Sequence, residues 1–160
     1  GEQFAITQFD VVVRNFVITE ADSAGAVHRH VGIHDAVEAT LATTGPHYFD
    51  DHDGQHFMGL AAKTDHRRMV MGGDCYNYAL LASGHLDIVC EANLKLHDYA
   101  ALVPVVEGAG GLMCDWNGDP LHGGSDGRVL ALGDPARLED VLGALGGEAP
   151  HSDRAADHEH

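Results

Sequence analysis

The chain has 160 residues, of which 44% are hydrophobic, so it can bury the core of one ordinary domain but has no room for a second domain of the same size. Its formal net charge is −16, from 25 acidic residues against nine lysines and arginines. Nucleic acid and anionic membranes would repel such a surface, so we expect neither as a partner.

The cysteines and the apolar runs indicate the cellular compartment. Cys75, Cys90 and Cys114 are odd in number and show no Cys-x-x-Cys pairing, which predicts reduced thiols rather than a disulfide framework. No apolar run approaches the roughly 18 residues that cross a bilayer. No basic region followed by an apolar stretch opens the chain. We therefore expect a soluble, unexported, cytoplasmic protein.

The first 71 residues predict a β-rich opening followed by a strand, a helix and a second strand. Residues 11–13 and 16–18 form two β-prone runs, a hairpin or two short strands, and residues 1–36 stay unassigned. Residues 39–44 predict a strand that Gly45-Pro46 closes. Residues 55–63 predict a short helix with Phe57, Leu60 and Ala61 on one face, and residues 67–71 predict a second strand.

The run from Asp50 to Gly54, with sequence DDHDG, contains three carboxylates that could hold a metal. A turn rich in Asp and Gly explains it equally well, and we favour the turn. The chain contains 13 histidines, but we expect no pair four residues apart on a helix, and therefore no histidine metal site.

The middle of the chain predicts a helix, a strand and a second helix. An acidic residue stands at the start of each helix and directly after the strand. From Asp74 the apolar spacing becomes helical, with Cys75, Tyr78, Ala79 and Ala82 on one stripe and Gly84 at the end. Residues 86–90 predict a central strand, and Glu91 follows it directly. Ligands gather beyond the carboxyl ends of strands in open α/β sheets, which favours a functional Glu91 over a solvated charge.

Asp98 precedes the next predicted helix, which buries Leu102, Val105, Val106 and Ala109. Its carboxylate could cap the free amides of the first turn or reach a metal ion, and the residues alone favour the cap. Pro104 should kink this helix unless the helix begins close to Ala100. Asp74 poses a similar choice between an N-cap and a pocket residue.

The C-terminal part predicts two more strands and a last helix. Strands are expected at residues 112–116, where Trp116 packs at the sheet margin, and at 128–132, with a turn at 117–120 between them. Residues 135–145 predict a helix with Leu138, Val141, Leu142 and Leu145 on its apolar stripe. Residues 147–160 predict a disordered polar tail.

Three segments resemble the inositol monophosphatase family of phosphomonoesterases. They are GGDCYNYALLASGHLD from Gly72, LKLHDYAALVPVVEGAGG from Leu94 and HGGSDGRVLALGD from His122, and they are most similar to the histidinol-phosphate phosphatase branch. His97 stands where the family usually has an aromatic residue. The resemblance covers residues 37–146 as the C-terminal lobe, and it implies an α/β fold, a mixed sheet flanked by helices in a layered αβαβα arrangement.

The resemblance implies a site and a reaction. Asp98 matches a ligand of the family's magnesium ion, Glu91 matches the acid that contacts the hydroxyl or amino end of the substrate, and Gly73, Asp74 and Cys75 match the turn that approaches it. The implied activity is magnesium-dependent hydrolysis of a small phosphate ester, with histidinol phosphate in histidine biosynthesis favoured over inositol phosphate. Relatives commonly form homodimers.

The family's other half supplies a Glu pair and an Asp-Pro-Ile-Asp-Gly-Thr loop, and this chain contains neither. One carboxylate with waters binds magnesium weakly. Three explanations stay open: a fragment of a longer enzyme, which we favour, a second chain that completes the site, or a non-catalytic module that binds phosphate ligands or other proteins. Residues 1–36 could then be a remnant of the missing lobe.

Overall fold

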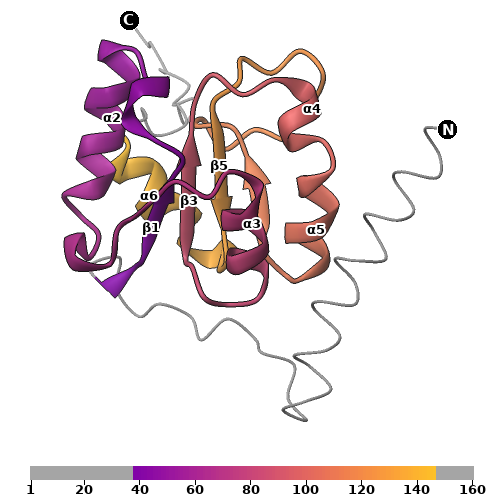
Figure 1. Cartoon of the computed structure of the whole chain (residues 1–160), viewed down its shortest axis with the longest axis horizontal. Helices are drawn as coiled ribbons and strands as arrows, with labels where there is room; N and C mark the ends of the chain where they lie inside the picture. Colours follow the sequence, from indigo (N-terminus) through magenta and orange to yellow (C-terminus); the bar gives the residue numbers. More distant parts are fainter. Residues whose placement is uncertain (1–37, 147–160) are drawn as a thin grey trace, which may run out of the picture.

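A computed structural model describes residues 38–146, so the β-prone opening and the polar tail expected at 1–36 and 147–160 lie outside the described residues. A five-stranded sheet of order β2-β1-β3-β5-β4 forms the centre, and helices cover both of its faces (Figure 1). β1 is parallel to β2 and β3, whereas β5 is antiparallel to β3 and β4. The expected mixed α/β sheet is therefore confirmed.

All five strands lie where the sequence predicts them, with altered limits. They are β1 (Leu41–Thr43), β2 (Val70–Met71), β3 (Ile88–Glu91), β4 (Leu112–Cys114) and β5 (Val129–Leu132). β3 includes Glu91 rather than ending before it. Every residue of β3 and β5 is buried, as expected for central strands with both faces covered.

Side chains of the strands alternate between two apolar layers. One layer, under α2 (Asp51–Ala61) and α6 (Leu138–Ala144), receives the strand residues Leu41, Ile88, Cys90, Leu130 and Leu132. The other layer, under α3 (Cys75–Ala82), α4 (Leu96–Tyr99) and α5 (Leu102–Gly108), receives Ala42, Val89, Met113, Val129 and Ala131 (Figure 1). The two-residue repeat of the pleat produces this division.

Helix α2 begins at Asp51, four residues before the predicted start. The side chain of Asp50 caps it by accepting a hydrogen bond from the Asp53 amide at 2.7 Å, and the acids of the first turn suit the positive end of the helix. The interpretation of the DDHDG run as a turn is therefore wrong. The predicted buried face of Phe57, Leu60 and Ala61 is confirmed.

The early start of α2 also corrects the expectation about histidines. His52 and His56 both lie on α2, four residues apart, with their Nε2 atoms 3.2 Å from each other. Without the Asp50 cap, a helix beginning at residue 55 would contain only one of them.

The remaining helices agree with the sequence in position but not in every buried residue. In α3, Tyr78 is buried as predicted, but Asn77 and Leu81 are the other buried positions and Cys75 is exposed, because the first turn lies beside a cavity rather than over the sheet. Helix α5 begins at Leu102, so Pro104 falls in the first turn, where no intrahelical hydrogen bond is lost.

The C-terminal helix is divided into a 3₁₀ turn, η4 (Pro135–Arg137), followed by α6. Two further 3₁₀ turns, η2 (Pro46–Tyr48) and η3 (His66–Arg68), connect the earlier elements. Trp116 is a packing residue as predicted, and its Nε1 donates to the Val129 carbonyl at 3.2 Å. No helix within residues 38–146 has the length and apolarity needed to cross a membrane.

Candidate active site

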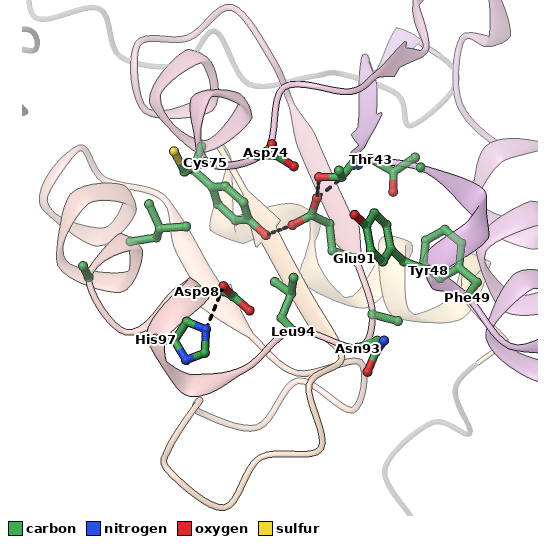
Figure 2. Close-up of a pocket in the computed structure, with 16 residues that line it drawn as sticks. Thr43, Tyr48, Phe49, Asp74, Cys75, Glu91, Asn93, Leu94, His97 and Asp98 are labelled. Atoms are coloured by element: carbon green, nitrogen blue, oxygen red, sulfur yellow. Dashed lines mark hydrogen bonds and ion pairs between the residues drawn. The ribbon is translucent and has the colours of Figure 1, made fainter.

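A cavity of about 500 Å³ opens at the edge of the sheet where the parallel strands β1 and β3 end (Figure 2). The first turn of α3, the loop after β3, and α4 provide most of the remaining wall. Asp74, Cys75, Glu91 and Asp98 all line it, and Gly73 lies in the turn next to Asp74. The fold therefore brings four of the five predicted site residues, which come from the start of α3, from β3 and from α4, to one cavity.

Glu91 is buried at the floor of this cavity, with 4% of its surface exposed. Its carboxylate accepts three hydrogen bonds: from the Thr44 amide at 3.0 Å, from the Thr44 hydroxyl, and from the Tyr78 hydroxyl at 2.6 Å (Figure 2). A buried carboxylate is stable only with such partners. The alternative of a solvated charge at a strand end is therefore wrong, since this side chain is fixed in orientation.

Burial, and then the negative charge of Glu91, raises the pKa of Tyr78 well above its usual value near 10. The Tyr78 hydroxyl therefore keeps its proton and remains a donor to Glu91. Burial also raises the pKa of Cys90, and it raises the pKa of Cys114 to about 12. Both thiols are free and buried, as small apolar residues would be.

These shifts predict that the protein loses stability in alkaline solution. In the unfolded chain the two thiols and the Tyr78 hydroxyl ionise near pH 9 and 10, whereas the folded protein holds these protons more tightly. The stabilisation is complete below about pH 9 and declines as the pH rises toward about 12. Urea midpoints at about pH 8 and pH 10.5 measure it, and Cys114→Ala should reduce the difference. Equal midpoints would contradict the assignment.

The turn before α3 has an unusual backbone. Gly73 has φ +101°, which strains any residue with a side chain, and a Cβ there would also lie 2.5 Å from the Asn77 side-chain oxygen, so this position favours glycine. Asp74 occupies the N-cap position at φ +44° but its side chain makes no capping hydrogen bond. The alternative of a simple cap is therefore not supported. Asp74 and Asn93 are the non-glycine residues with positive φ between residues 38 and 146, and both line the cavity.

Asp98 is the third residue of α4 rather than the residue before a longer helix. Its Oδ2 accepts from the Lys95 amide at 2.7 Å, and its Oδ1 lies 3.5 Å from Nε2 of the exposed His97. The side chain is 41% exposed and faces the cavity that Glu91 also lines (Figure 2). Asp98 therefore caps α4 through one oxygen rather than the helix that follows it, while its other oxygen has no backbone partner among the described residues, and its role as a metal ligand stays a prediction.

The donor set around the cavity suits a hard cation. The lining residues provide three carboxylates, from Asp74, Glu91 and Asp98, and the hydroxyls of Thr43 and Thr44, with His97 as the only nitrogen ligand type among them. Magnesium binds oxygen ligands of this kind. Glu91 already accepts three hydrogen bonds, so Asp74 and Asp98 are the lining carboxylates with the most freedom to contact an ion.

A second group, Asp50, His52 and Asp53, also brings possible metal ligands together, with ligand atoms within 4.8 Å of one another. Asp53 is already paired, since its Oδ1 accepts from Nε of Arg128 at 2.7 Å, and Arg128 also bonds Asp126. Burial alone would raise the pKa of Asp126, but the hydrogen bonds from Arg128 lower it. A hard cation here would compete with that guanidinium group.

Sequence reasoning missed three residues of the candidate site. Thr44 and Tyr78 hold Glu91, and Asn93 adopts a left-handed backbone beside it. Tyr78 was predicted only as an apolar helix residue, although a tyrosine in such a stripe needs a partner for its hydroxyl. The partner itself, Glu91, lies on the strand β3, and no sequence spacing indicates it.

A model of the inositol monophosphatase family matches residues 20–146. The chain belongs to this family, and the resemblance drawn from its motifs is confirmed. Among curated relatives, the bifunctional phosphatase IMPL2 of Arabidopsis thaliana is 47% identical over 81 residues, which cover 51% of this chain and 23% of the relative. A histidinol-phosphatase of Chlorobaculum parvum is 34% identical over 74 residues, covering 46% and 28%.

Solved structures agree with the fold. An inositol monophosphatase of Zymomonas mobilis matches with a TM-score of 0.67 and 48% identity, over 69% of this chain and 43% of that one. The inositol monophosphatase of Anabaena matches with a TM-score of 0.62, over 78% and 49%, and at 23% identity it shows the fold alone. The chain thus spans about a quarter of these curated relatives and less than half of these solved structures.

Proposed function

We propose that this chain forms the alcohol-binding side of a magnesium-dependent phosphomonoesterase that acts on histidinol phosphate. The observation that carries the proposal is that Glu91 and Asp98, seven residues apart in sequence, face one cavity from different elements. A fixed acid at the floor and a half-exposed acid at the wall are suited to different tasks. Glu91 binds the leaving alcohol, and Asp98 holds the cation.

The charge of the cavity supports a cationic substrate. Within residues 38–146, its lining contains three carboxylates, from Asp74, Glu91 and Asp98, and no lysine or arginine. The ammonium group of histidinol would be attracted to these carboxylates, whereas inositol carries no positive charge. The rings of Tyr48 and Phe49 also line the cavity and offer apolar contact to an imidazole. The relative named histidinol-phosphatase is consistent with this choice.

The phosphate group needs a counter-charge that the cavity does not provide. When bound, a divalent cation supplies that charge and promotes attack by water on the ester. Asp98 contributes one ligand, and the capped Oδ2 keeps its carboxylate in place. Glu91 has lone pairs left after its three hydrogen bonds, so it can still accept a bond from the substrate's amino or hydroxyl group.

Phosphate release tests the proposal. If the coding sequence continues upstream, the extended protein should release phosphate from histidinol phosphate with magnesium and not with EDTA, whereas the 160-residue chain alone should bind magnesium weakly and be a poor catalyst. We expect kcat/KM at least about tenfold above that for inositol 1-phosphate, since one charged hydrogen bond separates the two. Binding of histidinol without turnover would favour the non-catalytic module, and a preference for inositol phosphate would contradict the assigned substrate.

The variant Glu91→Gln examines the role of the buried acid in the same assay. It should reduce kcat/KM for histidinol phosphate about 10- to 100-fold, which corresponds to a hydrogen bond to a charged group. Glu107→Gln is the matched control, because Glu107 is exposed on α5 and does not line the cavity. Equal losses in both variants would exclude a specific role for Glu91.

A further inference from the structure

We propose that His52 and His56 form a chelating site for a divalent transition-metal ion, for which Zn²⁺ is the test ion. The two side chains lie on one face of α2, with ring centroids 4.4 Å apart. Their Nε2 atoms approach to 3.2 Å. The site is separate from the candidate active site, since neither histidine lines the cavity of Glu91 and Asp98.

The distance between the two nitrogens fits a shared ion. In tetrahedral zinc sites the Zn–N bond is about 2.0–2.1 Å, which places two ligand nitrogens about 3.3 Å apart. The observed 3.2 Å matches this separation, so the two nitrogens would bind an ion without moving apart. A proton shared between the two nitrogens satisfies the same distance, so a metal ion would replace that proton and use both lone pairs.

A backbone contact fixes the tautomer of His56. Its Nδ1 contacts the carbonyl oxygen of Leu145, and a carbonyl can only accept, so Nδ1 carries the hydrogen. Nε2 of His56 is then a lone-pair nitrogen directed at His52. Metal-bound histidines commonly donate their other nitrogen to a carbonyl or carboxylate in this way.

The surroundings hold His56 rigidly and leave His52 accessible. Helix α2 packs closely on the end of α6, where a side chain on Gly59 would lie 2.8 Å from the Ala144 carbonyl oxygen. The His52 side chain is 71% exposed, so water can complete the coordination shell. The exposed acids Asp50 and Asp51 at the start of α2 add negative charge, which favours a cation.

The two nitrogen ligands favour a transition-metal ion over magnesium at this site. Imidazole nitrogen suits zinc, copper and nickel, whereas magnesium prefers oxygen ligands. Two protein ligands with water should bind more weakly than a closed site of four ligands. Zinc binding at this pair should therefore be reversible and unaffected by millimolar magnesium.

Calorimetric titration of the metal-free 160-residue chain with ZnCl₂, in the presence of magnesium, tests the proposal. We expect a tightest class of one ion per chain, and His52→Ala should weaken it at least about tenfold. His52 is mostly exposed, so its removal should not unfold the protein. His85→Ala is the matched control, because His85 is exposed and its Nδ1 pairs with the Ser83 hydroxyl. Equal affinities of the parent and His52→Ala would overturn the site.

Nitrogen NMR of the imidazole rings gives a second readout that does not depend on affinity. One equivalent of Zn²⁺ should shift the Nε2 signals of His52 and His56 together and leave that of His85 in place. Shifts confined to other histidines, or to only one of this pair, would overturn the proposal. The measurement uses no enzymatic activity, so its result is independent of the proposed phosphatase function.

Discussion

Asp98→Asn is expected to lower kcat for phosphate release by more than about 100-fold while changing the melting temperature by only a few degrees. Mutation of a residue that only hydrogen-bonds to a metal ligand typically lowers metal affinity or activity about 10- to 100-fold. Asp98→Asn should have a larger effect because it removes the charge of the ligand itself. The asparagine oxygen can still accept the hydrogen bond of the Lys95 amide, which the Asp98 carboxylate accepts at 2.7 Å. The loss should thus appear in activity rather than in folding.

Two further variants separate capping from metal binding. Asp98→Ala removes the cap as well as the charge, and should cost about 1 kcal/mol of stability in addition to activity. Asp134→Asn is the matched control, because Asp134 also caps a helix, through the Ala136 amide at 3.0 Å, but lies away from the cavity. Activity retained in Asp98→Asn would remove Asp98 from the metal site.

Leu130→Ala is expected to lower the free energy of unfolding by about 2–5 kcal/mol, the range typical of Leu→Ala substitutions in protein cores. Leu130 is fully buried on β5 and lies opposite Cys90 of β3 and Cys114 of β4 in the sheet. Both flanking strands and the helices α2 and α6 pack around it, so the cavity left by the smaller side chain cannot collapse easily. Most domains have only about 5–15 kcal/mol to lose.

Urea unfolding at neutral pH measures this loss. Met58→Ala serves as the control, because Met58 lies on α2 with 62% of its surface exposed and should change stability by less than about 0.5 kcal/mol. A loss below 1 kcal/mol at Leu130 would show that the core rearranges and that β5 is not the fixed centre of the sheet.

The sequence predicted the strands better than the helix ends. Continuous apolar runs at β3 and β5 indicate buried strands, because burial on both faces leaves no polar alternation. The start of α2 was wrong because composition alone favours a turn at DDHDG, whereas the Asp50 side chain accepts the Asp53 amide and starts a helix. Whether a capping hydrogen bond forms depends on the local backbone and side-chain geometry, which the residue types allow but do not determine.

Sequence also predicted only part of the candidate site. Motif resemblance identified Glu91 and Asp98, and the structure places both on one cavity. The hydrogen bonds that orient Glu91 come from Thr44 and Tyr78, on the loop after β1 and on α3. These partners meet because β1 and β3 are parallel neighbours, and strand order depends on pairing between distant segments.

Sequence motifs were enough to identify the family and the mixed α/β class, and they named Glu91 and Asp98 as candidate acids, because a motif lies within a single segment. Tertiary structure alone decided that Glu91 is buried and held by three donors, that Asp98 caps α4 while facing the cavity, and that His52 and His56 meet. The physical reason is that burial and hydrogen-bond partners are properties of the packed sheet and helices, which bring together residues that no local pattern connects.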